Sequence, residues 1–116
     1  MKENVIKTKS FAFALRVVKL AQYLQKEKQE YVLSKQVLRS GTAIGALVRE
    51  AEHGQSKADF ISKMSIALKE ANETEYWIDL LHQSGYISKE NFDSLRPDIE
   101  ELLKLLISIV KTSRAH

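Results

Sequence analysis

Apolar residues recur along this chain at alternating steps of three and four residues, the period of α-helices that pack against one another at a shallow angle. Two such series flank a short polar segment. The first consists of Val37, Gly41, Ile44, Val48 and Ala51, and the second of Phe60, Met64, Ala67, Ala71, Thr74, Ile78 and Leu81. Between them, Gly54 is predicted to end one helix with positive φ, and Ser56 with Asp59 forms an N-terminal capping pair for the next. Because so short a connection reverses the chain, the two helices are expected to be antiparallel.

A further series near the N-terminus predicts a first helix, from about residue 7 or 10 to about residue 28. Its inward residues are Phe13, Val17, Leu20 and Leu24, while Phe11, Leu15 and Val18 widen the apolar stripe beyond one face. The second helix is expected at about residues 34–53, with Ser34 as its N-cap. The third is expected at about residues 57–84, with Gly85 as its C-terminal stop.

A last helix is expected to start near Ser94. Pro97 has no amide hydrogen to donate and fits best in the first turn of a helix, so Ser88 would cap only a short turn before it. The sequence therefore predicts an all-α fold in one domain, residues 1–116, which is a length that supports a single core.

The last helix is apolar on more than one face, which favours self-association. Its inward series is Leu95, Ile99, Leu102, Leu106 and Ile109, and its other faces carry Leu103, Leu105, Ile107 and Val110. Because a helix that is apolar nearly all round is buried nearly all round, we expect a homo-oligomer. Leu105 and Ile107 are the predicted interface residues, and Trp77 is a possible aromatic anchor for which a core position is equally compatible.

Composition narrows the class of protein. The apolar share of 44% and charged share of 28% are typical of a soluble globular protein. The chain has no cysteine, which excludes disulfides and thiolate metal sites and is compatible with the expected cytoplasmic location. The apolar N-terminal patch is broken by Arg16 and Lys19, which argues against a signal peptide. The most apolar run, residues 102–110, is too short to cross a membrane.

The net charge of +3 is unevenly distributed. Residues 1–39 hold nine Lys or Arg and three Glu, a net charge of +6, whereas residues 40–116 have a net charge of −3. Basic residues of the first two helices recur at helical spacing, and on one side of a bundle they would form a strip that contacts phosphates. The candidate nucleic-acid-binding residues are Lys9, Arg16, Lys19, Lys26, Lys35, Arg39 and Arg49. Two alternatives stay open: a simple solvated surface, and pairing with the acidic third helix.

Candidate metal and phosphate motifs favour structural interpretations. Glu50-x-x-His53 and Asp79-x-x-His82 lie at the C-terminal ends of consecutive antiparallel helices, so roughly 40 Å would separate them at 1.5 Å per residue. They cannot share a metal pair within one chain. Gly41 and Gly45 lie mid-helix, where they favour close approach of a neighbouring helix over a phosphate-binding loop. We therefore predict neither catalytic residues nor a cofactor.

Three segments, RSGTAIGA at 39–46, REAEHGQSKADF at 49–60 and IALKEANETEYW at 66–77, resemble the bacterial four-helix-bundle proteins known as 23S rRNA intervening-sequence proteins. The resemblance extends over essentially the whole chain. It implies an antiparallel up-down-up-down four-helix bundle that assembles into a ring-like homopentamer. The family also looks related to the accessory variability determinant proteins of diversity-generating retroelements, which are basic, pentameric and thought to bind nucleic acid. No catalytic residue is established for the family, so none is carried over.

We therefore expect a non-enzymatic, oligomeric helical bundle that binds or scaffolds structured RNA or DNA. The alternative is a protein–protein adapter with no nucleic-acid contact. A metal enzyme is the third hypothesis, and it would require bound metal.

Overall fold

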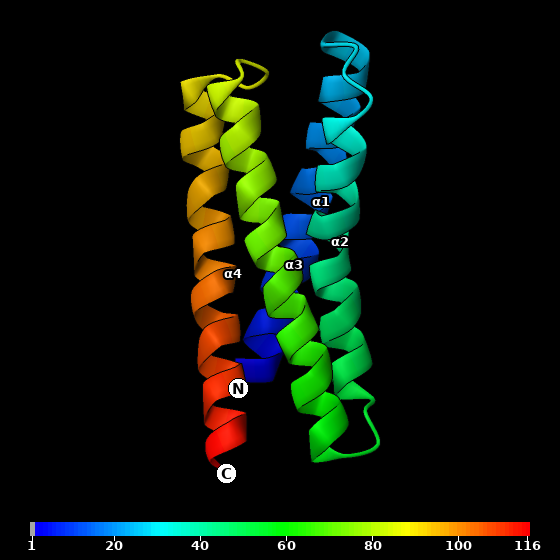
Figure 1. Cartoon of the computed structure of the whole chain (residues 1–116), viewed down its shortest axis with the longest axis vertical. Coiled ribbons are helices and arrows are strands. Elements are labelled where there is room, and N and C mark those ends of the chain that lie inside the picture. The colour runs from blue at the N-terminus through cyan, green and yellow to red at the C-terminus, as the bar shows by residue number, and fades with distance from the viewer. Residues whose placement is uncertain (1) are drawn as a thin grey trace.

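Four long helices form one antiparallel bundle in the computed structural model, which describes residues 2–116 (Figure 1). The helices are α1 (Lys2–Glu27), α2 (Leu33–Glu52), α3 (Lys57–Gln83) and α4 (Lys89–Ala115). Each helix packs against the next, and α1 also packs against α4. The bundle measures 46 × 21 × 19 Å, with both termini at one end. The all-α, up-down-up-down prediction is confirmed.

The core follows the predicted periodicity. Every residue of the inward series is buried except Phe60, which is half-buried and packs against the core. The largest fully buried side chains include Phe13, Leu24, Ile44, Met64, Ile78 and Leu106, so all four helices contribute to a single core.

Gly41 and Ser40 show how closely the helices approach. A Cβ atom on Gly41 would lie 2.8 Å from both γ-carbons of Val17, so α1 and α2 meet where only hydrogen fits. On the other side of α2, the buried Thr74 hydroxyl donates to Ser40 Oγ at 2.9 Å and satisfies both polar groups. Thr42, in contrast, donates back to the Leu38 carbonyl of its own helix. The packing interpretation of the helical glycines is thus confirmed at Gly41.

The start of α2 differs from the prediction, because Ser34 is not its N-cap. The N-cap residue is Val32, and the capping bonds come from Glu30 of the α1–α2 connection. Its carboxylate accepts the backbone amides of Val32 at 3.2 Å, Leu33 at 2.9 Å and Ser34 at 2.7 Å. Gln29, with φ of 53°, turns the chain so that the Glu30 carboxylate points back at these amides. Three of the four free amides at the helix start are therefore satisfied by one side chain.

For the α2–α3 connection, the prediction is confirmed at Ser56 and wrong at Gly54. The Asp59 amide donates to Ser56 Oγ at 3.1 Å, which is the predicted cap of α3. Gly54, however, does not adopt positive φ; α2 ends at Glu52, and the amides of His53 and Gly54 bond back to its last turn. Gly85 does adopt positive φ, at 87°, and follows the end of α3 as predicted.

Helix α4 starts at Lys89, earlier than the predicted start near Ser94. Ser88 caps the full helix, accepting the Asn91 amide at 3.1 Å, and Pro97 lies inside α4. Pro97 is exposed, so the bond that its missing amide cannot make lies at the surface and does not break the core. Arg16 of α1 donates to the Ser94 carbonyl at 2.9 Å, which supplies a hydrogen bond in the same turn.

Candidate interaction surfaces

Two of the predicted basic residues are bonded to α4. Lys9 pairs with Glu101 at 3.0 Å, and Arg16 pairs with Asp98 at 2.7 Å while also donating to Ser94 Oγ at 2.7 Å. Both basic side chains are directed at the α1–α4 seam. They help to close the bundle, and a phosphate would have to compete with carboxylates for them.

Arg39 is similarly engaged, on the other side of the molecule. Its guanidinium pairs with Glu70 at 3.2 Å and also with Glu73, both on α3. Burial acts to lower the pKa of Arg39, but attraction to the two carboxylates outweighs it and raises the pKa above the ordinary value. Arg39 therefore serves the α2–α3 contact, the pairing with the acidic helix that the sequence left open.

The remaining predicted residues, Lys19, Lys26, Lys35 and Arg49, form no ion pair within the part of the chain that the structure describes. Arg49 lies over the Phe11 ring, 5.3 Å from its centroid, near the α2–α3 turn. The lysines lie towards the other end of the bundle. The structure therefore does not bring the seven residues into one continuous strip.

The three lysines are joined by a fourth, Lys28, which the sequence reasoning did not select. Lys19 and Lys26 lie seven residues apart, about 10 Å along one line of α1. Lys28 follows α1 directly, Lys35 lies in the first turn of α2, and all four are exposed. We call Lys19, Lys26, Lys28 and Lys35 the α1–α2 lysine cluster. Residues 19–36 hold only two carboxylates, and one of them, Glu30, is buried at the start of α2.

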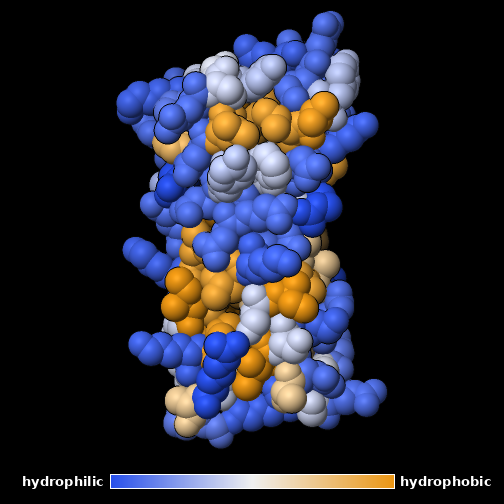
Figure 2. All heavy atoms as spheres, viewed as in Figure 1, coloured by the Kyte–Doolittle hydropathy of each residue, from blue (hydrophilic) through white to orange (hydrophobic). Residues whose placement is uncertain are grey.

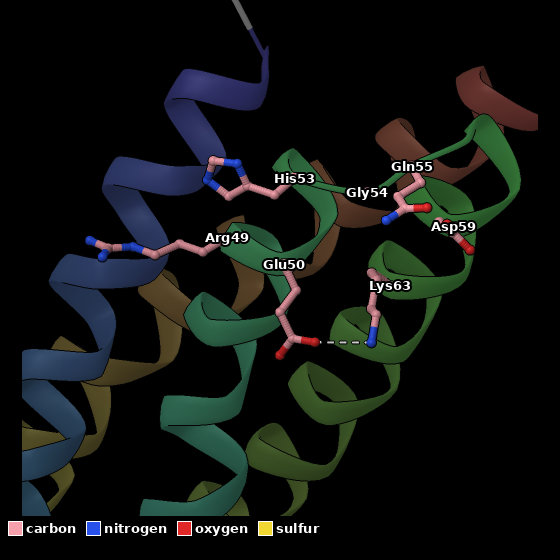
Figure 3. A pocket seen from close by; sticks show the side chains of 7 residues that line it. All are labelled: Arg49, Glu50, His53, Gly54, Gln55, Asp59 and Lys63. Carbon is pink, nitrogen blue, oxygen red and sulfur yellow. Dashed lines mark ion pairs between the residues drawn. The ribbon is translucent and has the colours of Figure 1, made fainter.

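Two cavities are candidates for a ligand. The first, of about 580 Å³, lies at the α2–α3 turn and is lined by Arg49, Glu50, His53, Gly54, Gln55, Asp59 and Lys63. Figure 3 shows Lys63 and Glu50 facing one another, 2.9 Å apart, while Arg49 extends away towards α1. Because its opposite charges neutralise one another, this cavity offers little for a charged ligand.

The second cavity is a groove of about 310 Å³ between α1 and α4. It is lined by Arg16, Lys19, Leu20, Tyr23, Asn91 and Leu95. Leu20 and Leu95 are buried and form its base, while Lys19 connects it to the α1–α2 lysine cluster. We call it the α1–α4 groove.

The predicted interface residues differ in exposure. Trp77 and Leu105 are half-buried and pack against the core, whereas Ile107 is 51% exposed. The other apolar residues that suggested a second surface on α4, Leu103 and Val110, are buried within the bundle itself. Most of the apolar residues on the additional faces of α4 are therefore covered within a single chain.

Large apolar side chains are instead exposed along α1. Phe11 is 50% exposed, Leu15 is 53% exposed, and Val18 is also exposed; steps of four and three place them on one face. We call these three residues the α1 apolar stripe. The opposite view of the molecule, in which α2, α3 and α4 are in front, has two further apolar regions separated by a polar band (Figure 2). Such exposed patches are typical of interaction surfaces.

An ion-pair network links α3 to α4. Arg96 donates to Asp79 at 2.9 Å and pairs with Glu75 at 3.1 Å and with Glu100 at 2.7 Å. The bond to Asp79 raises the pKa of Arg96 despite partial burial, which opposes it. Residues of the acidic third helix are thus partly neutralised by its neighbour. Among the residues whose side chains the structure describes, no group of three or more His, Asp or Glu could hold a metal ion.

These features define a class: a small antiparallel four-helix bundle with charged and apolar interaction surfaces. Within the described residues, no helix is long and apolar enough to cross a membrane. A family model described as 23S rRNA-intervening sequence protein matches residues 2–108, and the chain belongs to that family.

A comparison with solved structures finds a protein of similar sequence and fold. It is a protein from Bacteroides thetaiotaomicron VPI-5482, described as a protein with unknown function from the S23 ribosomal protein family. It is 58% identical to this chain, with a TM-score of 0.93, and the match covers 96% of this chain and 99% of that one. A comparison with curated proteins gives no significant match.

Proposed function

We propose that this protein is a non-enzymatic homo-oligomer that binds structured RNA or DNA through the α1–α2 lysine cluster. The observation that supports this best is that Lys19, Lys26, Lys28 and Lys35 form no ion pair with a carboxylate of the described residues, whereas Lys9, Arg16 and Arg39 are paired. Arg49 also has no ion pair there, but it lies over the Phe11 ring at the other end of the bundle. Lysines without an internal partner can release counterions from phosphates at no cost in intramolecular bonds. An assembly would present one such cluster per copy and so add their affinities.

Charge reversal tests the nucleic-acid part. The double variant Lys26→Glu and Lys35→Glu should lower affinity for structured RNA at low salt by at least tenfold, measured by fluorescence anisotropy. The control is Lys104→Glu with Lys111→Glu, which changes the net charge equally at two exposed lysines of α4 that form no ion pair with the residues whose side chains the structure describes. In the wild type, log K should fall with log salt with a slope of roughly −3 to −4 if all four lysines contact phosphates.

No binding by the wild type at low salt would refute the proposal. Equal losses in the two double variants would show that only net charge matters and would remove the role of the cluster. Metal analysis of the purified protein addresses the enzyme hypothesis, which requires bound iron, manganese or zinc.

Self-association is supported by the α1 apolar stripe and by the homopentamer that the family resemblance implies. Burying a side chain such as Phe11 or Leu15 contributes about 1.5–3 kcal/mol, which an isolated chain forgoes. Light scattering should give a mass several times 13.3 kDa. A mass of 13.3 kDa at high concentration would contradict the proposal.

Two matched variants locate the contact. Leu15→Asp and Ile107→Asp each place a charge at a side chain that is about half exposed, so neither should unfold the bundle. Dissociation by Leu15→Asp alone would assign the interface to the α1 apolar stripe, and dissociation by Ile107→Asp alone would assign it to α4, as the sequence suggested. Should the stripe instead hold a different protein, Leu15→Asp would leave the mass unchanged and abolish co-purification of that partner after nuclease treatment; this is the adapter alternative.

A further inference from the structure

The α1–α4 groove combines features that suit a flat, partly apolar ligand with a negative charge. Its base is apolar, formed by Leu20 and Leu95, and the half-buried ring of Tyr23 lies beside them. Its rim is polar and basic, and Lys19 forms no ion pair with the residues whose side chains the structure describes. Of the helix pairs that touch in the bundle, α1 and α4 are packed least closely, which leaves this space between them.

Of the polar groups around the groove, Arg16 is held in place by hydrogen bonds, whereas the side chain of Asn91 is available to a ligand. Arg16 is held in place by Ser94 and Asp98, so its guanidinium is preorganised rather than free. Asn91 lies in the first turn of α4, where its backbone amide donates to Ser88 Oγ and its side-chain amide forms no hydrogen bond within the described residues. An amide that can both donate and accept is suited to the edge of a nucleobase.

We propose that the α1–α4 groove takes one unpaired nucleobase of a single-stranded segment or loop, stacked on Tyr23, with its phosphate near Lys19. The inference rests on the proposed function, because the α1–α2 lysine cluster begins at Lys19 and would carry the adjoining backbone. Every base has an aromatic face, so stacking gives affinity with little sequence preference. Structured RNA supplies such bases in loops and bulges, where they can be splayed out of the helix.

Tyr23→Ala tests the inference directly. Binding should be measured for a short single-stranded RNA, a single-stranded DNA and a duplex of the same length. We expect Tyr23→Ala to weaken both single strands by about 5- to 150-fold, since stacking of one base contributes about 1–3 kcal/mol. It should leave binding of the duplex unaffected. Tyr23→Phe keeps the ring and should bind as the wild type does.

Asn91→Asp is the second variant, which guards against loss of folding in Tyr23→Ala. An acid in the first turn of a helix is favourable, so the bundle should remain intact by circular dichroism. The new carboxylate at the rim should weaken single-strand binding by repelling the phosphate.

The outcomes separate the two proposals. If Tyr23→Ala and Asn91→Asp, both folded, bind single strands as the wild type does while Lys26→Glu with Lys35→Glu does not, the inference is overturned and the proposed function stands. If Tyr23→Ala weakens single strands and duplex equally, stacking in the groove is also overturned. If the wild type binds no nucleic acid at low salt, the proposed function fails and the inference fails with it.

Discussion

Replacing Glu30 should destabilise the protein far more than replacing any exposed glutamate. The Glu30 side chain is only 9% exposed, and its two oxygens accept three backbone amides at the start of α2. Oε1 bonds Ser34, and Oε2 bonds Val32 and Leu33. Glu30→Ala removes all of these bonds at once.

The expected loss follows from the chemistry of helix starts. Replacing a capping residue by alanine costs about 0.5–2 kcal/mol, and each hydrogen bond to a charged group contributes about 1.5–3 kcal/mol before hydration of the freed amides is subtracted. Val32 is exposed and Leu33 is half-buried, so their freed amides can be hydrated, whereas Ser34 is buried. We therefore expect about 2–3 kcal/mol for Glu30→Ala. Glu30→Gln should cost less, about 1–2 kcal/mol, because its NH₂ group replaces one of the two accepting oxygens and cannot accept an amide.

The assay is urea unfolding followed by far-ultraviolet circular dichroism at one protein concentration, since assembly makes stability depend on concentration. Glu27→Ala is the matched control: Glu27 is the exposed last residue of α1, next to the connection, and its replacement should change stability by no more than about 0.5 kcal/mol. In thermal unfolding, Glu30→Ala should lower Tm by roughly 10 °C for a chain of this length.

The pH dependence gives a second, independent readout. Burial alone would raise the pKa of Glu30, but the bonds from Leu33, Ser34 and Val32 outweigh it and lower the pKa below its ordinary value of 4.5. A lowered pKa in the folded state means that the stabilisation is complete above pH 4.5 and is lost as the pH falls through the folded-state pKa. The difference between wild type and Glu30→Gln should therefore be full at pH 7 and shrink in acid. A Glu30→Ala protein as stable as Glu27→Ala at pH 7 would show that this reasoning about the cap is wrong.

Two further predictions concern packing and charge. Gly41→Ala should lower the free energy of unfolding in urea by about 1–3 kcal/mol, because the new Cβ would lie 2.8 Å from Val17. Gly45→Ala should instead stabilise the protein by up to about 1 kcal/mol, since the nearest atom to its Cβ would be 3.5 Å away. A stabilising Gly41→Ala would contradict the observed closeness of α1 and α2. Arg96→Met should lower the free energy of unfolding by about 1–2 kcal/mol, because it leaves the carboxylates around Arg96 without a neutralising charge. The loss should be smaller at high salt, which screens the repulsion between these carboxylates. A loss of stability that does not change with salt would indicate a packing effect instead.

The interior of the bundle could be predicted from the sequence because it depends on local periodicity. The spacing that places Ile44, Met64 and Leu106 inward is a property of each helix alone, and packing followed it at every helix. The ends depended on the conformation of the connections. No sequence motif indicates that Gln29 adopts φ of 53° and brings Glu30 back to α2, so a serine at the expected position appeared to be the cap.

The surface was less predictable, because a charge pattern within one helix does not identify its neighbour. Arg16 pairs with a residue 82 positions away and Arg39 with residues 31 and 34 positions away. The helical spacing of these basic residues was correct, but their partners depend on which side of each helix faces α3 or α4. The α1 apolar stripe has the same origin: the sequence shows that Phe11 and Leu15 widen the apolar surface of the first helix beyond one face, but only the position of α2 and α4 shows that they lie outside the core.

The α1–α2 connection links folding to the proposed binding. Were the Glu30 carboxylate in solution, it would lie two residues from Lys28 and would, together with the adjacent Glu27, reduce the positive potential there. Instead its charge is directed at the amides of α2, where it satisfies the positive end of the helix. The same hydrogen bonds that start α2 thus leave the lysines around the turn with Glu27 as the only exposed carboxylate among residues 19–36. At the α1–α4 and α2–α3 contacts the opposite holds, because acids there pair with Lys9, Arg16 and Arg39 across helices. Positive charge is therefore retained around the turn where the acid is used by the backbone, and under the proposed function we expect a polyanion to meet little competition from carboxylates there.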